Sequence, residues 1–358
     1  MNKTILITGG AGFIGSHVVN YFTDKYPETH FIVIDSLTYA SNLKNIMQVE
    51  GSSVGWKPNM TFWNTDIRNV DSLQTLFKSH NIDGIIHLAA ESHVDNSIKD
   101  PNIFVETNVI GTLNLLNVAK EFWGEGSENR FHHVSTDEVY GDLTLDEQPF
   151  VETTPYDPSS PYSASKAASD HFVRAYGRTY GMNITISNCS NNYGPHQHAE
   201  KLIPVVIKKL MHGEKIPVYG KGENVRDWLW VGDHVTAIDE IFHNGKKGHT
   251  YNVGGDNELT NIELIYKICE LFNNLYKNVE SPIVNLPDFP IKFVTDRKGH
   301  DLRYAVNSNK LQTNLNWKPE KKIYDGLLET IEYYVRTKIV NGKLEYENRT
   351  INTGRSNP

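Results

Sequence analysis

The N-terminal run TILITGGAGFIG constrains the fold of this 358-residue chain more than any other segment. It opens as an apolar strand, and a helical pattern follows its glycines. Gly10, Gly12 and Gly15 satisfy GxGxxG, and Gly9, Gly12 and Gly15 satisfy GxxGxxG. Glycine allows a tight turn and lets backbone N–H groups approach a pyrophosphate at the positive end of a helix. The run therefore predicts a strand, a turn and a helix that bind a dinucleotide.

An acidic residue stands where such a unit needs one. The apolar run FIVID ends in Asp35, about 20 residues beyond the glycines, where a carboxylate can accept a hydrogen bond from the ribose 2′-OH of NAD. Ser36 follows, rather than an arginine that could pair with a 2′-phosphate, so NAD is favoured over NADP. The alternative is a glycine turn with a solvated aspartate, but strand, glycines, helix and acid occur in the required order.

Two adjacent acids follow another apolar run. STDEVYG comes directly after FHHVS, and YSASK follows further along the chain. Tyr162 and Lys166, at i and i+4, share one helix face, where the ammonium can lower the pKa of the phenol and make it a usable base. Asp137 and Glu138 suggest a further proton-transfer step, with one carboxyl removing a proton and the other donating one to a leaving group. Both can face one site only if the backbone leaves strand geometry at about Thr136; a solvated turn is the alternative.

Composition indicates an ordinary globular chain, with 39% hydrophobic and 22% charged residues. The net charge of −8 and the lack of a basic block argue against nucleic acid as a partner. No apolar run approaches a membrane span, and the MNK start leads into a strand rather than a signal peptide. Cys189 and Cys269 cannot form a disulfide framework, so a reducing cytoplasm is expected. No ligand spacing predicts a metal, and Cys189 is expected to be a small buried residue.

The order of predicted elements indicates an α/β fold: a Rossmann-type, doubly wound parallel sheet with a smaller α/β C-terminal lobe. We predict a nucleotide-binding domain over 1–190 that carries the catalytic residues, a substrate lobe over 191–340 and a polar tail over 341–358. Strands are predicted at 4–8, 31–35, 61–64, 84–89, 131–135 and 183–188. Helices are predicted at 13–25, 70–79, 101–122, 161–180, 200–212, 261–273 and 323–337.

The glycine motif, Asp35, STDEVYG and YSASK together resemble the extended short-chain dehydrogenase/reductase superfamily, and within it the dTDP-glucose 4,6-dehydratase family. The resemblance runs from Thr4 to about Trp317 and includes LAAESHVD, NNYGP, EKLIP, VYG, RDW and DRKGHDLRYA. The adjacent acids are the most specific mark of this resemblance. Related UDP-glucuronate decarboxylases and GDP-mannose dehydratases have a Ser-Glu pair at these positions, and 4-epimerases usually lack both acids. Two departures are Asn96, where the family commonly has arginine, and His198-Ala199, in place of an aromatic-proline pair.

This resemblance implies a redox-neutral reaction on dTDP-glucose, as in deoxysugar (rhamnose-type) biosynthesis. Tyr162 would take the 4-OH proton as hydride passes from C4 to NAD, while Lys166 holds the phenol's pKa down and Thr136 bonds the 4-oxygen region. Glu138 would remove the C5 proton and Asp137 would protonate the departing C6 hydroxyl, after which hydride returns to C6 and a 4-keto-6-deoxy sugar results. NAD would then behave as a prosthetic group. A homodimer paired through the helices at 101–122 and 161–180 is also implied, with burial inside one chain as the alternative.

The resemblance also implies the contact residues. Those expected at NAD are Gly9, Gly12, Phe13, Ile14, Gly15, Asp35, Ser36, Leu37, Thr38, Asp66, Ile67, Leu88, Ala89, Ala90, Ser92, Thr107, Tyr162, Lys166 and Asn192. Those expected at the sugar nucleotide are Ser92, Thr136, Asn191, Lys201, Leu202, Pro217, Val218, Tyr219, Arg226, Asn261, Arg297, His300 and Tyr304. Arg226 and Arg297 suit a pyrophosphate because the planar guanidinium donates two parallel hydrogen bonds.

Plain structural roles compete with several of these assignments. Phe13 and Ile14 could be ordinary core residues, Asp66 could cap a helix, and His300 could be a structural histidine.

Two other functions also compete with the dehydratase. Another NAD-dependent dehydratase, epimerase or decarboxylase of UDP-, CDP- or GDP-sugars would not need Asp137 as an acid. A non-catalytic NAD-binding regulator would leave Tyr162 unexplained.

Overall fold

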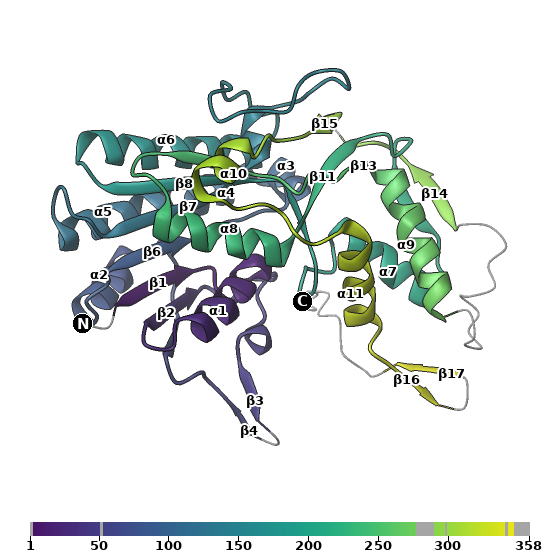
Figure 1. Cartoon of the computed structure of the whole chain (residues 1–358), viewed down its shortest axis with the longest axis horizontal. Helices are drawn as coiled ribbons and strands as arrows, with labels where there is room; N and C mark the ends of the chain where they lie inside the picture. Colours follow the sequence, from purple (N-terminus) through teal and green to yellow (C-terminus); the bar gives the residue numbers. More distant parts are fainter. Residues whose placement is uncertain (1–2, 51–52, 277–289, 298, 341–342, 347–358) are drawn as a thin grey trace.

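The computed structural model describes residues 3–50, 53–276, 290–297, 299–340 and 343–346, and its largest feature is a parallel sheet (Figure 1). Seven strands pair in the order β12-β8-β7-β6-β1-β2-β5, all parallel. Their bounds are β1 Thr4–Thr8, β2 His30–Asp35, β5 Met60–Asn64, β6 Gly84–His87, β7 Arg130–Thr136, β8 Asn183–Cys189 and β12 Thr250–Val253. The predicted doubly wound α/β sheet is confirmed, and each of its predicted strands is present.

Helices cover both faces of this sheet, which explains why its strands are apolar along almost their whole length. On one face α1 and α8 pack through residues such as Val18 and Ile238. On the other face α2, α5 and α6 pack through residues such as Leu73, Leu115 and Val173. The bounds are α1 Phe13–Lys25, α2 Val70–Ser79, α5 Thr112–Trp123, α6 Pro161–Thr179 and α8 Val231–Asn244.

The helix predicted over 101–122 is divided into three segments. It consists of α4 Pro101–Phe104, the π-helical η2 Val105–Gly111 and then α5, and a short helix α3 Val94–Lys99 precedes it. The wider π turn places Thr107 on the cavity described below. It also buries Asn108, whose side chain accepts from Glu91 N (2.8 Å) and donates to Ser165 Oγ (2.8 Å). A single period of 3.6 residues therefore cannot describe this segment.

The smaller lobe lies beside the carboxyl end of the sheet and has its own core (Figure 1). Ile207 of α7, Ile265 of α9 and Leu327 of α11 meet there. Its helices are α7 Leu202–Met211, α9 Asn261–Tyr276 and α11 Ile323–Val335. Its strands are β9 Asn191–Tyr193, β10 Ile216–Tyr219, β11 Val225–Trp230, β13 Glu258–Thr260, β14 Ile291–Val294 and β15 Arg303–Tyr304.

The chain enters this lobe, returns to the large sheet and enters the lobe again. Helix α8 packs on α1, and β12 pairs with β8 as the seventh strand, although both lie beyond residue 190. The boundary expected at residue 190 therefore marks where the chain first leaves the sheet, not a cut between two continuous domains. The physical reason is that β8 needs a neighbour for its outer backbone groups, and the neighbour comes from a later segment.

The remaining elements are short. They are η1 Leu43–Asn45, the hairpin of β3 Gln48–Glu50 and β4 Ser53–Gly55, η3 Asp137–Tyr140, α10 Asn309–Leu315 and the hairpin of β16 Thr337–Val340 and β17 Lys343–Tyr346. Most of the polar tail expected over 341–358 lies outside the described residues, because only 343–346 are described. Within the described ranges, no helix is long and apolar enough to cross a membrane.

Candidate active site

A cavity of about 370 Å³ opens where β1, β2, β6, β7 and β8 reach their carboxyl ends. Open α/β sheets bind ligands at this edge. The residues expected at a cofactor that line it are Gly9, Gly12, Phe13, Ile14, Gly15, Asp35, Ser36, Thr38, Asp66, Ile67, Leu88, Ala89, Ala90, Ser92, Thr107, Tyr162, Lys166 and Asn192. Those expected at a substrate that line it are Ser92, Thr136, Asn191 and Lys201, beside the acids Asp137 and Glu138.

The glycine loop forms one wall. Gly9 has φ +69, and a Cβ there would lie 2.7 Å from Ala89 N. A Cβ on Gly15 would lie 2.0 Å from the carbonyl oxygen of Gly9, so only glycine lets helix α1 start this close to the turn. Gly12 is the N-cap of α1 and supplies no side-chain cap, and the first turn carries no acid. Backbone N–H groups at the positive end of α1 are therefore available to an anion, which fits a pyrophosphate.

The carboxylate of Asp35 holds the two loops beside this helix together. Its Oδ2 accepts from Ala11 N (2.9 Å), and its Oδ1 accepts from Leu37 N (2.8 Å) and from the Ser41 hydroxyl (2.7 Å). Leu37, which has φ +55, is the expected cofactor residue that does not line the cavity. Asp35 thus has a structural role in addition to the ribose contact expected of it, and it also lines the cavity.

The two acids lie where the backbone leaves the sheet, as predicted. Strand β7 ends at Thr136, and Asp137 and Glu138 form the first turn of η3. Asp137 is 1% exposed, and burial raises its pKa well above the usual value, with the charges of Glu138 and Asp227 adding to this effect. Burial also raises the pKa of Glu138, but Arg226 and Lys201 oppose it. The two neighbours therefore have different tendencies to ionise.

Tyr162 and Lys166 lie on the cavity from the first turns of α6. Helix α6 begins with a capping box between Ser160 and Ser163, with Pro161 at its first position, so this start is strongly determined. Burial raises the pKa of Tyr162 well above its usual value, and Glu138 raises it further. The Lys166 ammonium donates to the carbonyl oxygen of Val134 (2.9 Å). The expected lowering of the phenol's pKa is thus outweighed by burial in this structure.

A second group of expected substrate residues lies beyond Glu138, in the smaller lobe. Arg226 is 8% exposed, stacks 4.4 Å from the centre of the Tyr304 ring and donates to the carbonyl oxygen of Asp301 (3.0 Å). Arg297 lies 5.5 Å from the centre of the Tyr219 ring. It also forms an ion pair with Asp95 of α3 (2.6 Å), which joins the two lobes. Both arginines lower the pKa of Glu138, so they face the same site.

The other expected substrate residues are less close to the cavity. His300 pairs with Asp296 (2.7 Å), while Leu202 and Asn261 begin α7 and α9. Pro217 and Val218 lie on β10, and Val218 is 2% exposed in the core of the smaller lobe. The described cavity is lined by none of these residues, nor by Arg226, Arg297, Tyr219 or Tyr304.

The structure also shows whether Asp66 and Cys189 have the plain structural roles considered for them. Asp66 does not cap α2, since the N-cap is Asn69, whose side chain accepts from Ser72 N (3.0 Å). Instead Asp66 pairs with Arg68 (2.7 Å) at the rim of the cavity. Cys189 is buried, as expected of a small core residue, and burial raises its pKa to about 12, so its thiol is not a ready nucleophile.

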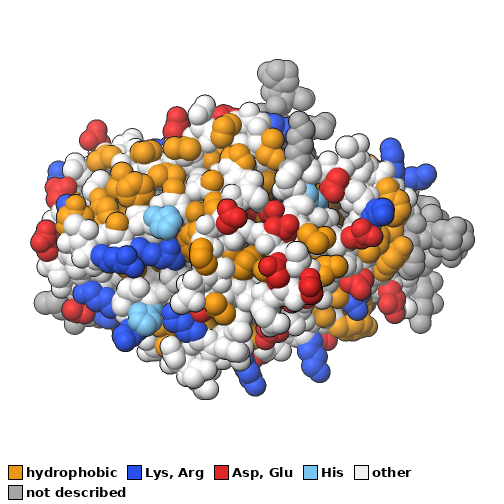
Figure 2. Space-filling view, turned by 90° about the horizontal axis from the view of Figure 1, so that it is seen from above, with side chains coloured by type: hydrophobic (Ala, Val, Ile, Leu, Met, Phe, Trp, Pro, Cys, Tyr) orange, Lys and Arg blue, Asp and Glu red, His pale blue; other side chains and the backbone are white. Residues whose placement is uncertain are grey.

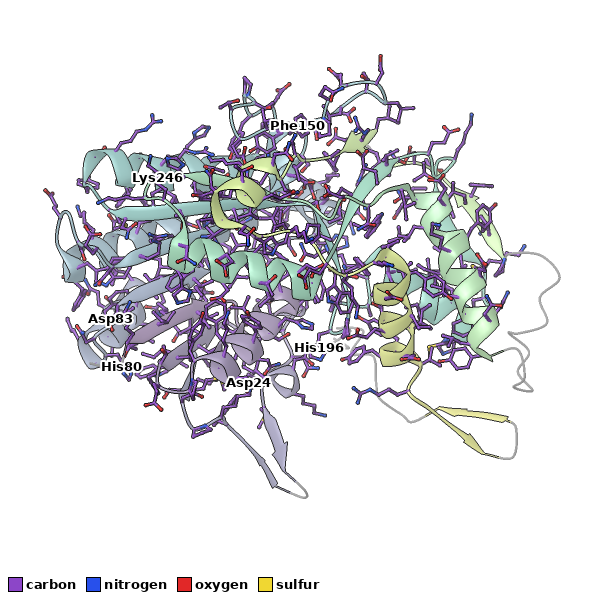
Figure 3. The ribbon with its side chains drawn as sticks, viewed as in Figure 1. Asp24, His80, Asp83, Phe150, His196 and Lys246 are labelled. Carbon is purple, nitrogen blue, oxygen red and sulfur yellow. The ribbon has the colours of Figure 1, made fainter. Side chains whose placement is uncertain are left out.

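The loop after β9 ties the smaller lobe to the glycine helix. His17 Nε2 donates to the carbonyl oxygen of Pro195 (2.8 Å), and Ser16 Oγ lies 3.3 Å from His196 Nδ1. The His196 ring also meets Tyr333 of α11, with ring centres 5.1 Å apart, so this residue lies between α1 and α11 (Figure 3). The loop therefore fixes one side of the cavity against both lobes.

Sequence reasoning missed several residues that line the cavity. They are Ile34, Ala40, Ser41, Thr65, Arg68, Glu91, Ile103, Val134, Ser135, Cys189, Ser190, Gln197, His198 and Glu200. Glu200 lies between His93 (3.6 Å) and His198 (3.5 Å), and His198 meets the Tyr39 ring. Most of these residues come from loops with no local motif. The only sequence feature that could have identified them is that they lie next to segments with a recognised motif. Three segments distant in sequence meet at Glu200.

Together, the sheet, the glycine loop and the Tyr162–Lys166 pair define an NAD-binding enzyme of the extended short-chain dehydrogenase/reductase class. The family model described as GDP-mannose 4,6 dehydratase matches residues 6–330. The dTDP-glucose 4,6-dehydratases of Escherichia coli and Haemophilus influenzae are each 45% identical to the chain, covering 92% of it and 92% and 97% of their own lengths. The chain belongs to the dTDP-glucose 4,6-dehydratase family.

Solved structures agree with this assignment. The dTDP-glucose 4,6-dehydratase of Bacillus anthracis in complex with NAD has a TM-score of 0.81 at 40% identity, covering 93% of this chain and 97% of its own. That of Streptomyces venezuelae, also with NAD bound, has a TM-score of 0.82 at 42% identity, covering 92% and 96%. The UDP-glucose 4-epimerase of Thermotoga maritima reaches 0.80 at 27% identity, covering 93% and 99%. The backbone alone thus does not separate dehydratase from epimerase, and the site residues must do so.

Proposed function

We propose that this protein is a hydro-lyase that converts dTDP-glucose to dTDP-4-keto-6-deoxyglucose and water with a tightly held NAD. The observation that carries the proposal is the pair of adjacent carboxyls at the end of β7. Burial, Glu138 and Asp227 favour a protonated Asp137, as a general acid requires. Burial raises the pKa of Glu138, and the charges of Arg226 and Lys201 oppose this rise, toward the ionised form that a general base requires. An epimerase would need neither group.

The first chemical step uses the hydroxyl groups of Tyr162, at the start of α6, and of Thr136, at the end of β7. Tyr162 accepts the proton of the sugar 4-OH, and the Thr136 hydroxyl, which lowers the pKa of that phenol, bonds the same oxygen region. A nearby positive charge is needed to overcome the effect of burial on Tyr162, and Lys166 supplies one from the same helix face. NAD, when bound, accepts a hydride from C4 and later returns it to C6.

The two acids then remove water. The C4 ketone acidifies the C5–H, and Glu138 takes that proton, while Asp137 gives its own proton to the C6 hydroxyl as this leaves. Glu138 returns a proton to C5 once C6 has been reduced. The cavity carries a cradle that fits NAD: glycines that a Cβ would clash with, an uncapped helix end and a carboxylate at the end of β2. Arg226 and Arg297 would bind the substrate's pyrophosphate from the other lobe.

Incubation of the purified protein with dTDP-glucose tests the proposal. We expect a 4-keto-6-deoxy product, no net NADH and NAD released when the protein is denatured. UDP-, CDP- and GDP-glucose at equal concentration test the choice of base. A 4-epimer or a decarboxylated product would replace the proposal with a related sugar-nucleotide reaction, and bound NAD without turnover would favour a regulator.

We further infer a homodimer in the cytoplasm. Ile98, Val105, Ile110 and Phe172 are each between 38% and 49% exposed, and they lie on α3, η2 and α6, which pack on one another. Figure 2 shows hydrophobic side chains gathered at the end of the molecule where Figure 1 places α6. An apolar face of this kind favours a second copy of the chain. Light scattering should give twice the chain mass, and Val105→Glu should reduce it to one chain.

A further inference from the structure

The helix that carries Tyr162 and Lys166 also carries a buried acid to which the proposed reaction gives no role. Asp170 lies at i+4 from Lys166 on α6, and its exposure is 0%. Ionised side chains are seldom fully buried without partners, because removing them from water costs several kcal/mol. Helix α6 packs on β7, the strand that ends at Thr136 (Figure 1). Asp170 therefore lies close to the catalytic residues without lining the cavity.

The hydroxyl of Tyr156 is committed to Asp170. It donates to Asp170 Oδ2 at 2.8 Å. The Tyr156 hydroxyl oxygen itself accepts from Arg174 (2.6 Å) and from the Asn188 amide (2.9 Å). A phenol has one proton to donate, and with both lone pairs occupied it can only give that proton to the carboxylate. The contact thus favours the ionised form of Asp170.

A neutral histidine lies on the other side of the carboxylate. His133 Nε2, on β7, is 3.2 Å from Asp170 Oδ1, and both side chains are buried. Burial lowers the pKa of His133 to about 4, so its imidazole is uncharged at neutral pH. Burial raises the pKa of Asp170, but His133, Lys166 and Arg174 outweigh it, and the net pKa is lowered. Asp170 is therefore a buried anion.

The matching buried cation is Lys166. Its ammonium donates to the carbonyl oxygen of Val134 at 2.9 Å, which leaves its charge to be balanced from elsewhere. Burial lowers the pKa of Lys166, and Asp170 is the strongest group that opposes this effect. Among the described residues, other titratable or charged groups that act on one of the two are His87 of β6, Cys189 of β8, Tyr140 of η3, Arg174 of α6 and Tyr156.

We propose that Asp170, held by Tyr156 and His133, is a positioning residue that keeps Lys166 protonated beneath Tyr162. Without this carboxylate, the ammonium would be an uncompensated buried charge and would lose its proton at a lower pH. Lys166 could then no longer favour the Tyr162 phenolate. The inference rests on the proposed function, in which Tyr162 accepts the proton of the 4-OH.

The pH profile of turnover tests this role. The substrate is dTDP-glucose with deuterium at C4, so that hydride transfer contributes more to the measured rate. In Asp170→Asn the alkaline limb of the kcat profile should move to lower pH by about 1 to 2 units, which is the effect of one charge about a helical turn away at an effective dielectric constant near 20. At the pH of the wild-type limb, kcat should fall roughly 10- to 100-fold. Asp170→Glu, which restores the charge, should return the limb toward the wild-type position.

Tyr156→Phe is the matched control. It removes one of the hydrogen bonds that hold Asp170 but keeps the charge of the carboxylate, so its alkaline limb should move by much less than that of Asp170→Asn. An equal shift in Tyr156→Phe and Asp170→Asn would mean that packing, not charge, is responsible, and would overturn the proposal. Should Asp170→Asn not fold, Asp170→Ser removes the same charge and leaves room for a water molecule. Thermal melting and NAD content show that each variant is intact.

A measurement independent of turnover completes the test. In protein carrying 13C-labelled lysine, the Cε signal of Lys166, assigned through Lys166→Arg, should titrate at a lower pH in Asp170→Asn than in the wild type. Unchanged titration with an unchanged alkaline limb would overturn the role of Asp170 while leaving normal product formation intact. Wild-type protein that forms no 4-keto-6-deoxy product would instead overturn the proposed function.

Discussion

The two walls of the candidate active site are built by different means. The cofactor wall consists largely of backbone: Gly9 and Gly15 allow the close approach of strand and helix, and the first turn of α1 is uncapped. The wall proposed for the substrate lies beyond the lining of the cavity and consists of long side chains such as Arg226 and Arg297, which come from separate parts of the smaller lobe. A site built from backbone groups needs a short contiguous sequence motif. A site built from side chains needs only residues that the fold brings close together, wherever they lie in the sequence. The two walls should therefore respond differently to substitution.

The junction of the two walls, where Tyr162 lies, should give the largest effect. Tyr162→Phe removes the group that accepts the proton of the 4-OH, so C4 oxidation should stop and product formation should fall roughly 10⁴-fold. Bound NADH should not accumulate, as measured by its absorbance. Tyr176→Phe on the same helix, where the hydroxyl meets Asn117, is the control and should turn over normally. NADH formation in Tyr162→Phe would contradict the assignment.

Asp137→Asn should separate oxidation from water loss. The amide cannot give a proton to the departing hydroxyl, so turnover should fall roughly 10²- to 10⁴-fold while C4 oxidation continues. Enzyme-bound NADH should then build up, in contrast to Tyr162→Phe. Asp146→Asn, in an exposed turn further along the chain, is the matched control. If Asp137→Asn dehydrates normally and only Glu138→Gln is impaired, the mechanism with two acids is wrong.

On the cofactor wall, Gly15→Ala should damage NAD retention. The new Cβ would lie 2.0 Å from the carbonyl oxygen of Gly9, so the glycine loop must shift. Overpacking of this kind costs about 1 to 3 kcal/mol, and we expect roughly a 10-fold or greater loss of bound NAD in purified protein. Gly55→Ala is the control, because nothing lies within 4 Å of a Cβ there. Full NAD content in Gly15→Ala would show that the loop does not cradle the cofactor.

On the substrate wall, Arg226→Gln should change the pH dependence as well as affinity. Burial already raises the pKa of Glu138, and Arg226 is the first group that lowers it. Its loss should raise that pKa further, so the acid limb of the kcat profile should move to higher pH. A shift of about one unit means a tenfold lower rate on that limb. Arg303→Gln loses a charge that faces Glu258 instead, so its acid limb should not move.

Local sequence predicted the cofactor wall well because each signal acts over a few residues. The helices expected at 13–25 and 70–79 have those bounds in the structure, and the step out of strand geometry occurs at Thr136. The order of strand, glycines, helix and acid also predicted the nucleotide-binding unit. The π turn at η2 was missed because the 3.6-residue period of the sequence does not reveal it, and the hydrogen bond between Asn108 and Glu91 N that accompanies it joins residues 17 positions apart.

The sequence by itself thus determined the sheet, the glycine cradle and the chemical identity of the four groups proposed for catalysis, since steric and hydrogen-bonding rules for neighbouring residues suffice for these. Only the tertiary structure decided that β12 closes the sheet from beyond residue 190, that Asp227 raises the pKa of Asp137, and that Arg226 lowers the pKa of both adjacent acids. It also decided that Asp170 lies between His133 and Tyr156. The physical reason is that burial and charge act through space, so residues distant in sequence set the ionisation of this site.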